Sequence, residues 1–218
     1  MTADPTLKRQ ASKVVRALRR DYPDVQCALR YDSPFQLLVA TVLSAQCTDK
    51  QVNIVSKALF EKCPTAVDLA AFPLKKLEKV IQSTGFFRNK AKNIKALSRR
   101  LMANFDGEVP QDLELLVKLP GVGRKTANVV LGTAFAIPSG VVVDTHVGRI
   151  SRRLGLTRET DAVKCEQDLM RLLPRKEWID YSHRLIHHGR QVCQARKPDC
   201  DSCGFIRFCP RIGVSASS

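Results

Sequence analysis

Residues 119–130, LPGVGRKTANVV, are the stretch from which the fold is most directly inferred, because two glycines and a basic pair separate two apolar runs. Gly121 and Gly123 can adopt backbone angles that other residues avoid, so the loop turns tightly. We expect the amides of Gly121, Val122 and Gly123 to point outward with the helix N-terminus and bind a phosphate oxygen. The spacing is not that of a nucleotide P-loop. A helix–hairpin–helix on a DNA backbone phosphate is therefore favoured over a helix–helix turn without a ligand.

Lys125 lies in the first turn of the second helix, where the helix dipole favours anions. Arg124 adds a second positive charge beside it and is expected to contact DNA. The dipole, the neighbouring cation and partial burial would together favour the neutral amine that a Schiff-base nucleophile must be. From these features alone, a nucleophile and a phosphate ligand remain equally open as roles for Lys125.

Asp144 follows three valines in VVVDTHVGR, residues 141–149. A buried segment would hold this carboxylate at the start of a helix, where it can act as the N-cap. It can also be the acid–base or electrostatic partner of Lys125, which favours the nucleophile for that lysine. His146 is close enough in sequence to touch a phosphate, although a structural hydrogen bond is the simpler interpretation.

The charge of the chain indicates a polyanionic partner. Lys and Arg number 36 against 21 Asp and Glu, a formal net charge of +15. Such a surplus favours nucleic acid over a membrane surface or a basic protein kept soluble by its charge. Aromatic residues are only 6%, which argues against broad single-strand stacking platforms. With no apolar signal region and no run approaching about 18 apolar residues, we expect a cytoplasmic protein with no signal peptide and no membrane partner.

Four cysteines crowd the C-terminal stretch VCQARKPDCDSCGFIRFCP with the spacing C-x6-C-x2-C-x5-C: Cys193, Cys200, Cys203 and Cys209. Reduced thiols in one tight loop predict a metal site. Zinc usually takes two separated pairs, so an iron–sulfur cluster is favoured, with zinc remaining open. Arg196 and Lys197 lie in the same loop and could contact phosphates. A folding staple without a role in chemistry is compatible with either metal.

Almost all of the remaining sequence has helical periodicity, so the expected fold class is all-α. Ser33 and Pro34 predict the start of one helix, and Thr48 with Asp49 predicts the start of the next. SGVVVDTH, residues 139–146, is the only β-branched run and is short.

Taken together, LPGVGRKTA, VDTHV and the four-cysteine spacing resemble the endonuclease III family, DNA glycosylases and AP lyases of the helix–hairpin–helix superfamily. LSAQCTD and STGFFRNKA are also similar to family segments, and the resemblance runs from about residue 8 to residue 211. It implies a two-lobed helical fold. A six-helix barrel lobe with the hairpin would span residues 27–137, and a lobe carrying a [4Fe-4S] cluster would combine residues 1–26 and 138–218.

The resemblance also implies the reaction. A monomer would bind double-stranded DNA containing damaged pyrimidines or abasic sites, with the damaged base flipped out. Lys125 would attack C1′ of the sugar and form a Schiff base, Asp144 would assist, and β-elimination would cut the strand. Oxidised or ring-saturated pyrimidines are the implied lesions in this base excision repair.

Two further positions are implied by the resemblance. Gln46 would fill the hole left by the flipped base, and Phe86 or Phe87 would be the wedge from the opposite side. Aliphatic residues or tyrosine are commoner there, so the pair of phenylalanines is a departure, and the choice between them stays open. The alternatives to this function are a mismatch adenine glycosylase and a non-catalytic DNA-binding module with a structural metal. The first lacks the lysine, and the second would not need Lys125 and Asp144 together.

Overall fold

The structure, a computed structural model, describes residues 4–214, and every regular element in that range is helical. The all-α prediction is confirmed. Residues 141–143, the one β-branched run, form a buried loop that pairs with no strand in the described part of the chain. Their burial in an irregular segment explains why valines stand there without a sheet.

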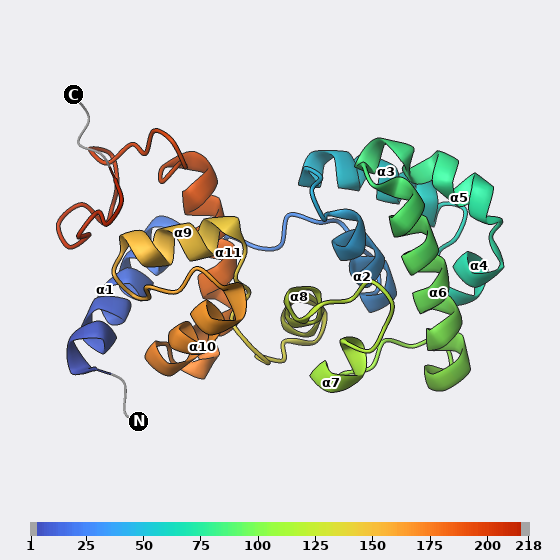
Figure 1. Cartoon of the computed structure of the whole chain (residues 1–218), viewed down its shortest axis with the longest axis horizontal. Coiled ribbons are helices and arrows are strands. Elements are labelled where there is room, and N and C mark those ends of the chain that lie inside the picture. The colour runs from blue at the N-terminus through green and yellow to red at the C-terminus, as the bar shows by residue number, and fades with distance from the viewer. Residues whose placement is uncertain (1–3, 215–218) are drawn as a thin grey trace. The chain divides into compact units, whose positions relative to one another are not determined.

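The chain divides into two compact units. One, the central unit, is Cys27–Ser139, and the other, the terminal unit, combines the segments before and after it. Figure 1 shows the helices of each. No helix among the described residues has both the length and the apolar character needed to cross a membrane.

The central unit is built around α2, a helix whose residues are nearly all apolar. Residues 35–43 are all buried, so other helices cover every face of α2. The elements of this unit, in chain order, are α2 (Pro34–Leu43), α3 (Asp49–Phe60), α4 (Ala66–Ala71), α5 (Leu74–Ile81), the 3-10 helix η1 (Gln82–Thr84), α6 (Phe87–Phe105), α7 (Leu113–Leu116) and α8 (Arg124–Phe135). Helix α8 packs against α2, and α6 packs along α4 and α5 (Figure 1).

Two predicted helix starts in this unit are confirmed. The Ser33 side chain accepts a hydrogen bond from the Gln36 N–H at 3.2 Å, and Pro34 occupies the first turn. The Thr48 side chain likewise accepts from the Gln51 N–H at 3.3 Å. Each bond satisfies one amide that a helix N-terminus leaves without a partner.

The terminal unit joins the first helix to the last ones. It contains α1 (Pro5–Asp21), α9 (Thr145–Arg153), α10 (Ala162–Leu172), the 3-10 helix η2 (Arg175–Glu177) and α11 (Trp178–Gln191). Helix α11 packs against both α1 and α9. Val14, Ile150 and Leu185 contribute to a core separate from that of the central unit. The buried Glu177 pairs with Arg19, which ties η2 to α1.

Candidate active site

The hairpin between α7 and α8 contains the glycines singled out in the sequence. Gly121 has φ +76°, and a Cβ placed on it would meet the Asn93 side chain at 2.8 Å. This position therefore requires glycine for both its backbone angle and its close approach to α6. The prediction for Gly123 was wrong in its reason, since φ is −90°, a conformation open to any residue. A Cβ on Gly123 would meet no atom of the protein within 4 Å, so packing within the protein does not require glycine at this position.

The loop amides are only partly available to a ligand. Val122 is buried, and its N–H bonds the Leu119 carbonyl at 3.1 Å, so the expectation that this amide points outward is wrong. Within residues 4–214, no acceptor takes the N–H groups of Gly121 or Gly123. Gly123 is the N-cap of α8 and has no side chain to satisfy the first turn. The unsatisfied amides at this helix start are therefore suited to an anion.

Lys125 is the second residue of α8 and lies in its first turn, as the sequence predicts. Its side chain is exposed, which corrects the expectation of partial burial. It forms no hydrogen bond or ion pair within the described part of the chain. An amine without a competing carboxylate at a helix N-terminus is free to meet either a phosphate or an electrophile.

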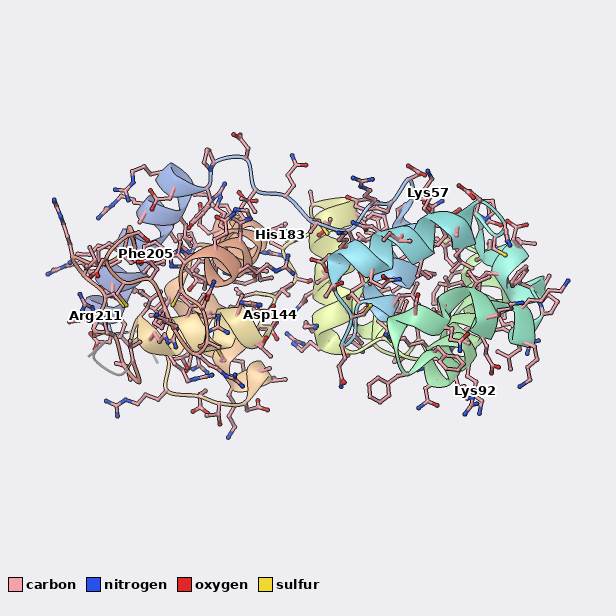
Figure 2. The ribbon with its side chains drawn as sticks, turned by 90° about the horizontal axis from the view of Figure 1, so that it is seen from above. Lys57, Lys92, Asp144, His183, Phe205 and Arg211 are labelled. Carbon is pink, nitrogen blue, oxygen red and sulfur yellow. The ribbon has the colours of Figure 1, made fainter. Side chains whose placement is uncertain are left out.

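Asp144 is the N-cap of α9, where its Oδ1 accepts a hydrogen bond from the Val147 N–H at 2.8 Å. It is half-buried and belongs to the terminal unit, whereas Lys125 belongs to the central unit. Figure 2 labels Asp144 at the start of this helix. Its negative charge also acts on the Arg149 guanidinium. Burial lowers the pKa of Arg149, and the charge of Asp144 opposes that effect. One carboxylate oxygen is thus used for the cap, and a carboxylate retains a second acceptor oxygen.

His146 makes the structural contact that the sequence analysis favoured. Its Nδ1 lies 3.2 Å from Nη2 of Arg149. The backbone of Gly189 approaches the ring so closely that a Cβ there would lie 2.7 Å from Nδ1. His146 therefore packs between α9 and α11.

Two exposed loops of the central unit carry residues in the left-handed conformation. Gln46, between α2 and α3, has φ 53°, and Phe86, between η1 and α6, has φ 46°. A bulky residue with positive φ is uncommon and is often associated with a functional site. Gln46 is exposed, and Phe86 has 66% of its surface accessible.

Phe87 differs from its neighbour. It is half-buried and packs against the core of the central unit, with the Arg88 guanidinium carbon 5.4 Å from the centre of its ring. The two phenylalanines that the sequence could not tell apart therefore have different surroundings. Phe87 contributes to packing, and Phe86 projects its ring into solvent.

The four C-terminal cysteines line one pocket of about 400 Å³, a volume that includes space open to solvent. The rest of its lining is mixed, with apolar residues such as Ile150, Leu154 and Phe205 beside the polar side chains of Arg153 and His188. Figure 2 labels Phe205 and Arg211 in this part of the terminal unit. Burial is the main reason that the pKa of the Cys203 thiol is raised to about 11, and it also raises the pKa of the Cys209 thiol. Negative charge on the neighbouring cysteines raises both pKa values further. A cationic centre in the pocket would offset both effects and favour thiolates.

Hydrogen bonds from the surrounding chain reach the sulfur atoms. Nη1 of Arg153 lies 3.2 Å from Sγ of Cys193, and the Phe205 N–H donates to Sγ of Cys203 at 3.4 Å. Among residues 4–214, no three His, Cys, Asp or Glu side chains are grouped as for a single metal ion. Arg196 and Lys197, in the same loop, are exposed.

One buried residue of interest, Lys90, was not among the candidate site residues identified in the sequence. Lys90 of α6 is only 5% exposed, and its ammonium donates to the carbonyls of Leu43 at 2.8 Å and Thr84 at 2.7 Å. The signal was present in the sequence. Lys90 stands four residues before Ile94, on the apolar face of an amphipathic helix, where a lysine needs buried acceptors.

Comparison with known proteins agrees with this geometry. Residues 39–175 match the HhH-GPD superfamily base excision DNA repair protein family. The chain is 54% identical to endonuclease III of Synechocystis sp. over 95% of each chain, and 49% identical to endonuclease III of Bacillus subtilis over 86% of each.

Solved structures give the same result. A non-covalent endonuclease III–DNA complex is similar with a TM-score of 0.89 and 47% identity, covering 94% of this chain and 95% of that chain. A trapped endonuclease III–DNA covalent intermediate has the same TM-score and identity, covering 94% and 96%.

Proposed function

The chain belongs to the endonuclease III family of HhH-GPD base excision DNA repair proteins, and we propose that Lys125 and Asp144 carry its reaction. It is a bifunctional DNA glycosylase and AP lyase that acts on duplex DNA. One observation carries the assignment of the nucleophile. Lys125 is exposed and unpaired, directly after a hairpin whose Gly121 and Gly123 amides have no acceptor within the described residues.

The chemistry follows from an unpaired amine next to a bound DNA backbone. The target base leaves the stack, because C1′ is inaccessible within the duplex. The Lys125 nitrogen bonds to C1′ as the glycosidic bond breaks, and the electron pair leaves with the base, which takes up a proton. Loss of a proton from the nitrogen and opening of the sugar ring give the imine. Removal of a C2′ proton then expels the 3′ phosphate by β-elimination, and water later releases the lysine.

Asp144 has a role at two of these steps. It accepts a proton from the lysine nitrogen, and its negative charge stabilises the positive charge that develops on the sugar. Its cap bond to Val147 leaves the carboxylate oriented without neutralising it. A carboxylate held by the first turn of a helix keeps its direction through the reaction.

The substrate we propose is a duplex with an oxidised or ring-saturated pyrimidine, or an abasic site. Gln46 fills the space of the flipped base, and Phe86 is the wedge. The exposure of Phe86 supports this choice over Phe87, whose ring packs on the core. A ring that projects into solvent can stack on a base without first losing packing contacts with its own core.

The cysteine pocket suits a [4Fe-4S] cluster better than a zinc ion. Four thiols from one short loop line the same pocket, whereas zinc usually takes two separated pairs of ligands. Four cysteine thiolates are the ligand set by which iron–sulfur clusters are held in proteins. Cys193, Cys200, Cys203 and Cys209 would hold the cluster. Bound there, it would fix the loop that carries Arg196 and Lys197, so that these two cations could contact DNA phosphates.

Borohydride trapping tests the function. The wild-type chain is incubated with a duplex that carries one thymine glycol, and borohydride reduces any imine to a stable protein–DNA adduct. We expect an adduct with the wild type and none with Lys125→Gln. Lys118→Gln is the matched control, since Lys118 is an exposed lysine of the same hairpin and should leave trapping unchanged.

A parallel abasic-site duplex separates the alternatives. An adduct on the abasic site alone would retain the lysine chemistry and reject the proposed lesion. Tight binding without an adduct on either duplex would reject Lys125 as the nucleophile and favour a binding module.

A further inference from the structure

The loops that carry Gln46 and Phe86 are joined behind the surface by one buried amine. We infer that Lys90 is a positioning residue that holds these two loops at the spacing needed to invade the duplex. This inference rests on the proposed function, because it takes Gln46 and Phe86 as the inserting residues. Lys90 itself is buried and does not touch DNA.

The geometry is specific to the two loops. Leu43 is the last residue of α2, three residues before Gln46. Thr84 is the last residue of η1, two residues before Phe86. Nζ of Lys90 donates to both of their carbonyls, at 2.8 Å and 2.7 Å. The Lys90 backbone N–H also bonds the Phe86 carbonyl at 3.1 Å, so this residue contacts the second loop twice.

The loops need such a constraint. Gln46 and Phe86 are both left-handed, and such a residue holds this conformation only where the surroundings impose it. A further hydrogen bond nearby joins Gln51 of α3 to Ser83 of η1, from Nε2 to Oγ at 2.8 Å, and it is exposed to water. Water therefore competes less with the two buried hydrogen bonds of Lys90 than with the exposed bond between Gln51 and Ser83.

A packing role alone would not require a lysine. Burial lowers the pKa of Lys90, so its charge is costly at this site. An apolar residue of similar length would avoid that cost but would leave two buried carbonyls at helix ends without a donor. The lysine therefore supplies hydrogen-bond donors to the two carbonyls, and these bonds fix the positions of the two loops.

The same helix supplies a matched control. Lys95 of α6 is half-buried, and its amine donates to the Ala70 carbonyl at 2.8 Å and to the Phe72 carbonyl. These acceptors lie at the end of α4 and just after it, away from both inserting loops. Lys95→Met thus removes the same kind of two-carbonyl bond without affecting the spacing of the loops.

The experiment compares Lys90→Met with Lys95→Met in the full chain. Helix invasion is measured by the fluorescence of 2-aminopurine opposite an uncleavable tetrahydrofuran site, at saturating protein. Binding is measured by anisotropy, and the lyase step by single-turnover cleavage of an abasic duplex. We expect Lys90→Met to lower the fluorescence rise and to slow cleavage about 10- to 100-fold, while affinity falls no further than it does in Phe86→Ala. Lys95→Met should change each quantity less than about twofold. If Lys90→Met does not fold, Lys90→Gln, which keeps one amide donor, is judged by the same criteria.

Two outcomes would overturn the inference, and they differ in meaning. If the Lys90 and Lys95 variants behave alike, while Gln46→Ala and Phe86→Ala lower the fluorescence rise, the loops insert and Lys90 does not position them. If neither Gln46→Ala nor Phe86→Ala lowers the rise, the proposed role of both loops fails, and the inference fails with it.

Discussion

At the residue scale, the hairpin separates two glycines that are required for different reasons. Gly121 needs its positive φ and its contact with Asn93, whereas Gly123 has an ordinary backbone angle and open space beside it. We expect Gly121→Ala to lower the free energy of unfolding by about 1–3 kcal/mol. Gly123→Ala should change stability by less than about 0.5 kcal/mol but weaken DNA binding about tenfold, because its Cβ would hinder a phosphate. Urea unfolding and anisotropy measure the two effects. A stable Gly121→Ala protein, or unchanged DNA affinity in Gly123→Ala, would contradict this division.

The two phenylalanines make a second matched pair. Phe86→Ala removes an exposed ring, so stability should change by less than about 0.5 kcal/mol, while the affinity for a distorted duplex falls by about 1–3 kcal/mol. Phe87→Ala removes a ring that packs on the core, and we expect a loss of about 1–3 kcal/mol in the free energy of unfolding. Thermal unfolding and binding to a tetrahydrofuran duplex distinguish the two. The assignment of Phe86 as the wedge would fail if the Phe87 variant alone lost affinity at a temperature where it is fully folded.

At the element scale, α9 connects stability to the proposed chemistry through its N-cap. Asp144→Asn keeps an oxygen that can cap Val147, so we expect stability to remain within a few tenths of a kcal/mol. Asp144→Ala removes the cap and should cost about 1 kcal/mol. Both variants lose the carboxylate, so both should cleave abasic DNA at least about 100-fold more slowly. Equal activity of the wild type and Asp144→Asn would leave Asp144 only a structural role.

Helix starts could be predicted from sequence because each depends on a few neighbouring residues. Ser33 and Thr48 cap their helices as expected, since an N-cap is a local hydrogen bond. The valines at 141–143 show the limit of this reasoning. Their β-branched pattern indicates burial, which the structure confirms, but a strand also requires a partner strand that a local pattern does not reveal.

At the scale of the whole molecule, motifs located the candidate residues, whereas tertiary packing determined their surroundings. The exposure of Lys125, the bond between Val122 and Leu119, and the different environments of Phe86 and Phe87 all depend on how distant helices pack. Lys90 is the clearest case. Its acceptors lie 47 and 6 residues away along the chain, and no local pattern names them.

The separation into two cores predicts which parts of the chain would be destabilised by loss of the proposed cluster. Three of the four cysteines pack against the core of the terminal unit, and none belongs to the core of the central unit. We expect purified protein to contain about four iron and four sulfide per chain, by chemical assay and visible absorption. Oxidative removal of the cluster should speed amide hydrogen exchange in residues 193–209, α9 and α11, because the pocket walls lose their central contact. Exchange in α2 and α6 should stay unchanged, which serves as the internal control. One zinc per chain would contradict the cluster, and faster exchange throughout both units would contradict the independence of the two cores.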